Sequence, residues 1–189
     1  MSSTATLLFL LASAALFASA DQASPSSLAQ RYSLTTSTSL AFPTQTASSS
    51  DSATYIVESW GTSNGRFQDG STNFEFVEDP FPKNPVPVGE SATSGSVLRV
   101  TYPKGSFSHD TGGTQFYSLF NTSEDGGFQS MLITYEVAFA QGFDWVKGGK
   151  LPGLRGGNNY GCTGGSQATG EDCFTSRLMW RDNGTCFSC

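Results

Sequence analysis

"FTSRLMWRDNG", residues 174–184, is the stretch that decides the fold. Its first eight residues are rich in aromatic, aliphatic and arginine side chains, and this composition favours a β-strand over 174–181. Asn183 and Gly184 follow, and this pair is a strong hairpin signal because both residues tolerate positive φ. We therefore expect a returning strand, for which only the five residues 185–189 are left. The sequence predicts a sheet that is incomplete at its C-terminal strands, as in a truncated chain.

Five earlier segments share this strand-like composition. They are rich in β-branched or aromatic residues and are separated by loops rich in glycine and proline. They span residues 53–60, 73–79, 96–103, 114–120 and 130–140. In the last of them the apolar side chains alternate, so that Met131, Ile133 and Val137 share one face. Short strands between such loops predict an all-β domain, an antiparallel sandwich or jelly roll.

The first fifty residues differ from the rest. Residues 7–17 form an apolar run, and the sequence ASA at 18–20 fits a cleavage site, which predicts a signal peptide over 1–20 and a secreted protein. The run is shorter than the roughly 18 residues of a membrane span, so we expect no membrane partner. Residues 21–50 are mostly Ser, Thr, Ala, Gln and Pro, which predicts a disordered linker. One folded domain is left, over residues 51–189.

Secretion is consistent with the cysteines and with two sequons. Four cysteines allow three pairings, and Cys162 with Cys173 closes a short glycine-rich loop, so we expect this disulfide. The cysteines at 186 and 189 are assigned no redox or metal role. Asn121 and Asn183 begin the sequons Asn-Thr-Ser and Asn-Gly-Thr, and both are candidate glycosylation sites.

A basic, glycine-hinged segment stands out in this acidic chain. The formal net charge is −6, yet five of the ten Lys and Arg residues lie between positions 147 and 181. Against the three acidic residues of 144–181 this leaves an excess of two positive charges. The five are Lys147, Lys150, Arg155, Arg177 and Arg181. Such a field favours an anionic ligand, and the arginine fork suits carboxylates, although surface charge on a long loop is the alternative.

Lys150 has the most distinctive setting of these cations. The glycines at 148 and 149 allow close approach or positive φ, and LPG at 151–153 fixes the exit, so the lysine is presented from a bend. The spacing does not match a phosphate-binding loop. His109 is the only histidine, near Gln115 and Tyr117 in sequence, and is suited to acid or base work, although a lone histidine is more often structural. No pattern selects a serine triad, a zinc site or a carboxylate pair.

Four motifs together resemble a known family. They are GGTQFY at 112–117, YEVAFAQGFDWVKGGKLPGL at 135–154, GGNNYGCTGG at 156–165 and CFTSRLMWR at 173–181. They resemble the fungal secreted proteins of polysaccharide lyase family 14, over about residues 95–182. The family includes alginate lyases and enzymes acting on related glucuronic acid polymers. The resemblance implies a concanavalin-like β-jelly roll whose concave face holds a polyuronate chain.

The resemblance also implies β-elimination. A base removes the C5 proton of a uronate, positive or amide groups neutralise its carboxylate, and an acid protonates the departing O4. Lys150 would be the catalytic base or carboxylate partner, Arg177 would bind the carboxylate, and Thr175 or Ser176 would supply a hydroxyl. The groove residues would be Gln115, Tyr117, Lys147, Arg155 and Arg181, with His109 a weaker candidate. Family members continue into strands that carry proton-transfer tyrosines, and this sequence ends before them.

The leading hypothesis is therefore a secreted polyuronate lyase, with an acidic polysaccharide as its partner. We expect no cofactor, no metal and no nucleic-acid partner, and a monomer. Two alternatives stay open. One is a carbohydrate-binding module, or an inactive truncated homologue, that keeps the concave face without the chemistry, and the other is a secreted β-sandwich with a structural role.

Overall fold

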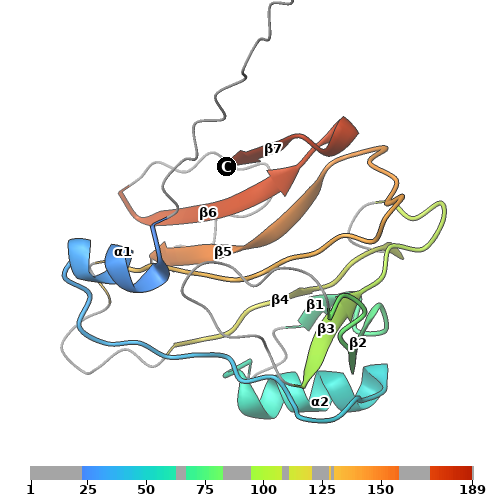
Figure 1. The fold of residues 1–189 in the computed structure, drawn as a ribbon, viewed down its shortest axis with the longest axis horizontal. Helices are drawn as coiled ribbons and strands as arrows, with labels where there is room; N and C mark the ends of the chain where they lie inside the picture. The colour runs from blue at the N-terminus through green and yellow to red at the C-terminus, as the bar shows by residue number, and fades with distance from the viewer. Residues whose placement is uncertain are drawn as a thin grey trace, which may run out of the picture.

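The computed structural model describes residues 23–62, 67–82, 95–107, 111–120, 128, 130–157 and 171–188, with 67–69 and 186–188 described by their backbone alone. The helices are α1 (Pro25–Arg31), α2 (Ser49–Ser59) and the short 3-10 helix η1 (Asp182–Gly184). The strands are β1 (Phe67–Asp69), β2 (Phe74–Glu78), β3 (Ser96–Val100), β4 (Gln115–Phe116), β5 (Gly149–Gly157), β6 (Cys173–Trp180) and β7 (Cys186–Ser188). In Figure 1 the sheet of β5, β6 and β7 lies at the top of the view, and α2 lies at the bottom beside β2 and β3.

Every strand pairing within the described ranges is antiparallel. β1 pairs with β4, β2 pairs with β3, and β6 lies between β5 and β7. The predominance of strands over helices is consistent with the all-β class expected from the sequence. These strands form small separate sheets, so the jelly roll stays a prediction. None of the helices described here is long and apolar enough to cross a membrane, and the predicted signal peptide over 1–20 lies outside the described residues.

Residues 53–60, which composition assigns to a strand, are mostly helical. Helix α2 begins after Ser48, whose side chain caps the helix by accepting a hydrogen bond from the N–H of Asp51. Ser52, Ile56 and Trp60 follow at intervals of four residues, a spacing that places them on one helix face, and all three are buried. The β-branched residues favour a strand by composition, but burial of this helix face outweighs that preference and determines the structure. The strand prediction for 53–60 is therefore wrong.

The main hydrophobic core lies between α2 and the β2–β3 hairpin. Ile56, Trp60, Phe74 and Phe76 are buried there. The rings of Trp60 and Phe76 meet edge to face, with centroids 5.8 Å apart, a geometry that aromatic pairs favour. The buried hydroxyl of Ser52 accepts a hydrogen bond from the backbone N–H of Phe76 at 3.0 Å, so a polar bond also joins the helix to β2.

Part of the predicted linker is packed against this core. The indole N–H of Trp60 donates to the carbonyl oxygen of Ala41 at 2.7 Å, and the hydroxyl of Ser96 donates to that of Pro43 at 2.6 Å. Ala47 pairs with Phe76 as an isolated antiparallel bridge. The disorder expected over 21–50 therefore does not hold for residues 41–47, because their backbone carbonyls satisfy polar groups of the core. Helix α1 lies within the same stretch.

The β2–β3 hairpin confirms the strands predicted over 73–79 and 96–103. Phe74 pairs with Val100 and Phe76 with Leu98, and both phenylalanines point into the core. Glu75 lies on the opposite face and forms an ion pair with Arg99, its direct partner across the hairpin. The alternation of buried and exposed side chains thus fixes the register.

The C-terminal hairpin confirms the strand, the turn and the returning strand that residues 174–184 predict. β6 covers almost the whole expected strand, and β7 returns along it with Leu178 opposite Ser188. The turn contains Asn183 at φ 61° and Gly184 at φ 71°, the positive φ values that this residue pair suits. The prediction for 114–120 is confirmed only for the two residues of β4.

A second aromatic cluster joins this sheet to the rest of the molecule. Tyr102, which follows β3, meets the buried Trp180 of β6 edge to face at 5.5 Å. The ring centroids of Phe139 and Phe143 lie 5.6 and 6.2 Å from that of Trp180, and the centroid of Trp145 lies 4.6 Å from that of Phe139. Each favourable aromatic pair contributes about 0.5–1.5 kcal/mol beyond its buried area.

The strand predicted over 130–140 is not formed. The segment is without regular structure, and Ile133 and Val137 are exposed. An alternating pattern supplies an apolar face, but a strand also needs a regular neighbour for its backbone. The segment precedes β5 in the chain. The pairing of β5 is interrupted by a proline and by a shift of register, and both features make a strand a poor partner for a further strand.

Candidate active site

The β5–β6 hairpin carries most of the residues that the sequence singles out. Gly149 lies opposite Trp180 and Lys150 opposite Met179, and further along Gly153 lies opposite Arg177. Residues directly opposite each other in an antiparallel pair have side chains on the same face of the sheet. Lys150 therefore shares a face with Met179 and, by alternation along β6, with Arg177.

A β-bulge makes this arrangement possible. Between the pairs Lys150–Met179 and Gly153–Arg177, β5 advances by three residues and β6 by two. The extra residue falls at Leu151 and Pro152, and proline, which has no N–H to donate, is accommodated in sheets at bulges. In a regular strand Lys150 and Arg155, five residues apart, would lie on opposite faces. With the bulge they share a face, because Arg155 lies opposite Thr175.

The glycines of β5 make room for side chains of β6. A Cβ at Gly149 would overlap the ring of Trp180, and one at Gly153 would overlap the Arg177 side chain and the Ser176 carbonyl oxygen. Positive φ is not needed at these two positions. These glycines are therefore needed because side chains of β6 approach the backbone closely, and not because of positive φ. The aliphatic stem of Arg177 lies against the backbone of β5 at Gly153.

Four of the predicted site residues come together on this face. Lys150 is exposed, whereas Arg155, Thr175 and Arg177 are half-buried. Diagonal neighbours on one sheet face have Cβ atoms roughly 7–8 Å apart, so one carboxylate can reach both Lys150 and Arg177. Ser176 lies opposite Leu154 on the other face. Thr175, and not Ser176, is therefore the hydroxyl that shares a face with Arg177.

The other predicted site residues lie around this face or apart from it. Lys147 and Arg181 are exposed at the end of the hairpin, where the Arg181 side chain lies close to Gly148. Gln115 donates a 3.4 Å hydrogen bond to the Tyr117 hydroxyl, so these two lie together. Gln115 belongs to β4, which ends just before Tyr117 and pairs with β1 and not with the hairpin. His109 lies outside the described residues.

Tyr102 is a titratable group at the edge of the hairpin that sequence reasoning does not single out. Its ring packs against Trp180 and lies so close to Gly113 that a Cβ there would be 2.8 Å from it. Tyr102 is 41% exposed, and the partial burial of its hydroxyl raises the pKa, because the ionised form loses part of its contact with water. The phenol is therefore kept protonated. No motif marks this residue, since the packing depends on a tertiary contact with β6.

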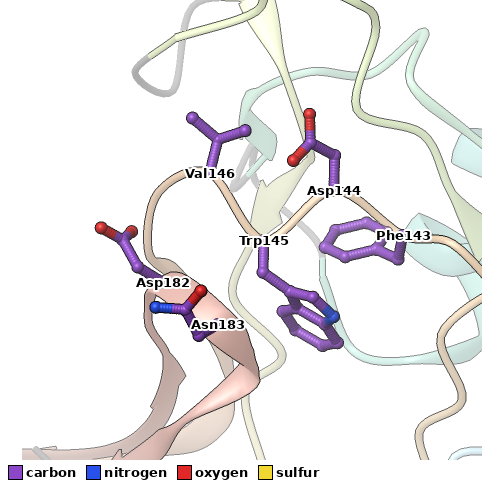
Figure 2. A pocket seen from close by; sticks show the side chains of 6 residues that line it. All are labelled: Phe143, Asp144, Trp145, Val146, Asp182 and Asn183. Carbon is purple, nitrogen blue, oxygen red and sulfur yellow. The ribbon is translucent and has the colours of Figure 1, made fainter.

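Next to the hairpin end lies an open hollow of about 430 Å³. It is lined by Phe143, Asp144, Trp145, Val146, Asp182 and Asn183. Figure 2 shows Asp182 and Asn183 of the η1 turn on one side and the segment from 143 to 146 on the other. The position that a Cβ of Gly184 would take is 3.5 Å from the Trp145 ring, so this turn rests on the indole.

Other predicted sites are only partly described. Cys173 is disulfide-bonded, and its partner is not among the described side chains, so the pairing with Cys162 stays a prediction. The Asn121 sequon lies outside the described residues. Asn183 is exposed in its turn. In the described part of the chain, no group of three or more His, Cys, Asp or Glu side chains is arranged to hold a metal ion.

Comparison with protein families gives one match. The model of the family described as Polysaccharide lyase 14 matches residues 90–187, just over half of the 189-residue chain. The matched stretch contains β3, β4, β5, β6 and all but the last residue of β7. Neither the curated proteins nor the solved structures include a match to this chain.

Proposed function

We propose that this chain, which belongs to the polysaccharide lyase 14 family, is a secreted enzyme that cleaves a uronic acid polymer, alginate or glucuronan, by β-elimination. The family supports lyase chemistry on a polysaccharide. The uronate is supported by one observation above all: the bulge of β5 gathers Lys150, Arg155 and Arg177 on a single face of the sheet. Three cations on one face, in a chain of net charge −6, form a local site for carboxylates.

The reaction needs positive charge beside the carboxylate of the uronate that is cleaved. Removing the C5 proton places negative charge on that carboxylate as an enolate, and the bond from C4 to the departing oxygen then breaks to leave a C4–C5 double bond. Groups aimed at the enolate lower the barrier only if they are held in place beforehand. The half-buried Arg177, with its stem across Gly153, is held in this way and can donate two parallel hydrogen bonds.

Lys150 and Thr175 complete the polar face in this proposal. Lys150 extends from the bulge towards solvent, where it can reach either the carboxylate or the C5 proton. Thr175 lies two residues before Arg177 on the same face and supplies a hydroxyl that can both donate and accept. Ser176 is given no part, because its side chain lies on the opposite face.

The proposal includes the β-jelly roll, with the face of Lys150 and Arg177 as its concave side. Two observations support this orientation. Thr175 and Arg177 are half-buried, whereas Phe174 and Leu178 on the other face of β6 are 47% and 41% exposed. The described sheets are also antiparallel throughout, as a jelly roll requires.

The test is to incubate the purified protein with alginate and with glucuronan and to follow ultraviolet absorbance, because the C4–C5 double bond conjugated to the carboxylate absorbs there. We expect absorbance to grow with at least one polymer and not with a neutral glucan of similar length. Lys104→Met is the matched control for Lys150→Met, since both remove one exposed cation. Binding of a polyuronate without absorbance would replace the lyase by a carbohydrate-binding function.

A further inference from the structure

The hollow beside the hairpin has no part in the proposed reaction. It borders the same turn but contains none of the residues of the cationic face. Two of its lining side chains are the carboxylates of Asp144 and Asp182. The neighbouring cations do not line it, and the Arg181 side chain lies over Gly148 instead. A uronate chain in this hollow would meet negative charge, so the hollow suits a neutral ligand.

Its other surfaces suit a sugar ring. Trp145 and Phe143 present aromatic surface, and Val146 is 60% exposed beside them. The hollow is open and most of its lining is polar, which suits a hydroxyl-rich sugar that rests on the surface, and its volume of about 430 Å³ is large enough for a small ligand. The hydroxyl and acetamido groups of an amino sugar can donate hydrogen bonds to the two carboxylates.

Asn183 supplies the ligand's point of attachment. It lines the hollow, it is exposed, and it begins the sequon Asn183-Gly184-Thr185. Thr185, the third residue of the sequon, is exposed as well. The turn holds Asn183 at φ 61°, with Gly184 resting on Trp145, so the amide is presented at the edge of the aromatic surface (Figure 2).

We propose that Asn183 carries an N-linked glycan whose first N-acetylglucosamine occupies this hollow, against Trp145 and Val146. In the transfer, the amide nitrogen of Asn183 bonds to the anomeric carbon of a lipid-diphosphate-linked oligosaccharide. The bond from that carbon to the diphosphate oxygen breaks, the lipid diphosphate leaves, and the amide loses one proton. The inference rests on the secretory route of the proposed function and is independent of the lyase chemistry. The bound sugar covers apolar surface and links the η1 turn to the segment from 143 to 146.

The test begins with site occupancy. The full chain is expressed in a eukaryotic secretory host, and its peptides are mapped by mass spectrometry. We expect N-acetylhexosamine on Asn183 in wild type and in Thr185→Ser, which keeps the sequon, and none in Thr185→Ala. A glycan at Asn121 with none at Asn183 overturns the proposal. Glycan at neither site overturns it together with the secretory route, while lyase activity of the same preparation still reports on the proposed function.

Stability then tests the placement of the sugar. Thr185→Ser, trimmed enzymatically to its first sugar, is expected to melt about 2–4 °C above Thr185→Ala. The same pair is then compared in the background of Val146→Ser, a change at an exposed residue outside the aromatic cluster. In that background the difference in melting temperature should shrink to the contribution of the hydroxyl at position 185, because the sugar has lost its apolar contact. An unchanged difference would show a glycan that projects into solvent, and would overturn the placement.

Discussion

At the scale of single residues, Lys150 is the group whose chemical role is most open to test. A lysine can either neutralise the uronate carboxylate or, when unprotonated, remove the C5 proton. Arginine keeps the positive charge but is effectively always protonated in proteins, so it cannot serve as a base. The two roles therefore predict different results for a substitution that conserves charge.

We expect Lys150→Arg to retain measurable lyase activity and Lys150→Met to lose about two to three orders of magnitude in kcat. The loss is the typical effect of removing one group that stabilises charge in the transition state. Initial rates of absorbance increase on a polyuronate measure both variants. If Lys150→Arg is as inactive as Lys150→Met, Lys150 is the base and the carboxylate is held by the arginines.

Tyr102 should make the stability of the folded protein fall at alkaline pH. Partial burial raises the pKa of its hydroxyl above the ordinary tyrosine value of about 10, so the folded state holds this proton more tightly than the unfolded state does. The stabilisation is fully present below the unfolded-state pKa and is lost as the pH rises through the folded-state pKa. Stability of the wild-type protein should therefore decline above about pH 10.

Tyr102→Phe should remove this part of the decline, since it leaves the packing on Trp180 in place and takes away the ionisable group. The measurement is the denaturant midpoint from pH 8 to pH 11, taken as the difference between wild type and variant. Tyr32→Phe, at a tyrosine that is 61% exposed, is the control. Parallel curves for Tyr102→Phe and wild type would show that the hydroxyl titrates alike in both states.

At the scale of elements, the bulge of β5 is what unites the cationic face. Deleting Pro152 removes the extra residue of the bulge and leaves three residues between Lys150 and Arg155. The two then lie four positions apart in a regular strand and keep the same face. Inserting one glycine after Pro152 requires a larger bulge or a slip of register, and a slip of one residue moves Lys150 to the other face.

The deletion should therefore retain far more activity than the insertion, which we expect to resemble Lys150→Met. Absorbance assays on a polyuronate measure the activities, and tryptophan fluorescence checks that Trp180 is still packed in each variant. Equal losses from deletion and insertion would show that the face on which Lys150 lies does not determine activity.

The elements differ in how far the sequence could predict them. The β6–β7 hairpin follows from local signals, the strand composition of 174–181 and the turn residues Asn183 and Gly184. Composition does not predict helix α2, because its β-branched residues favour a strand although its buried residues have helical spacing. The common face of Lys150 and Arg177 could not be predicted, because it depends on the bulge, and the bulge depends on how β5 registers against a strand about twenty-five residues away in sequence.

At the scale of the whole molecule, the folded unit begins before the expected boundary at residue 51. Trp60 depends on Ala41 for its indole hydrogen bond and meets the ring of Phe42 at 5.3 Å, and Ser96 depends on Pro43. Each such hydrogen bond contributes about 0.5–1.5 kcal/mol, and its loss leaves a buried group unsatisfied. The segment before α2 therefore belongs to the core of the protein.

A chain that begins at residue 48, and so keeps the Ser48 cap of α2, should be less stable by a few kcal/mol than one that begins at residue 35, since it loses these two bonds and the Ala47 bridge. Urea denaturation followed by tryptophan fluorescence compares the two. Equal midpoints would mean that residues 41–47 add nothing to the stability of the core and that the boundary at residue 51 is adequate.

The central claim is that a face built from Lys150, Thr175 and Arg177 performs elimination on a uronate polymer. The most direct measurement is the mass of the oligosaccharides released from alginate or glucuronan by the purified protein. Elimination predicts that each product with a newly formed non-reducing end is lighter by one water than the corresponding hydrolysis product, and that Arg177→Gln releases none under the same conditions. Products of hydrolytic mass alone, or equal product from Arg177→Gln, would contradict the claim.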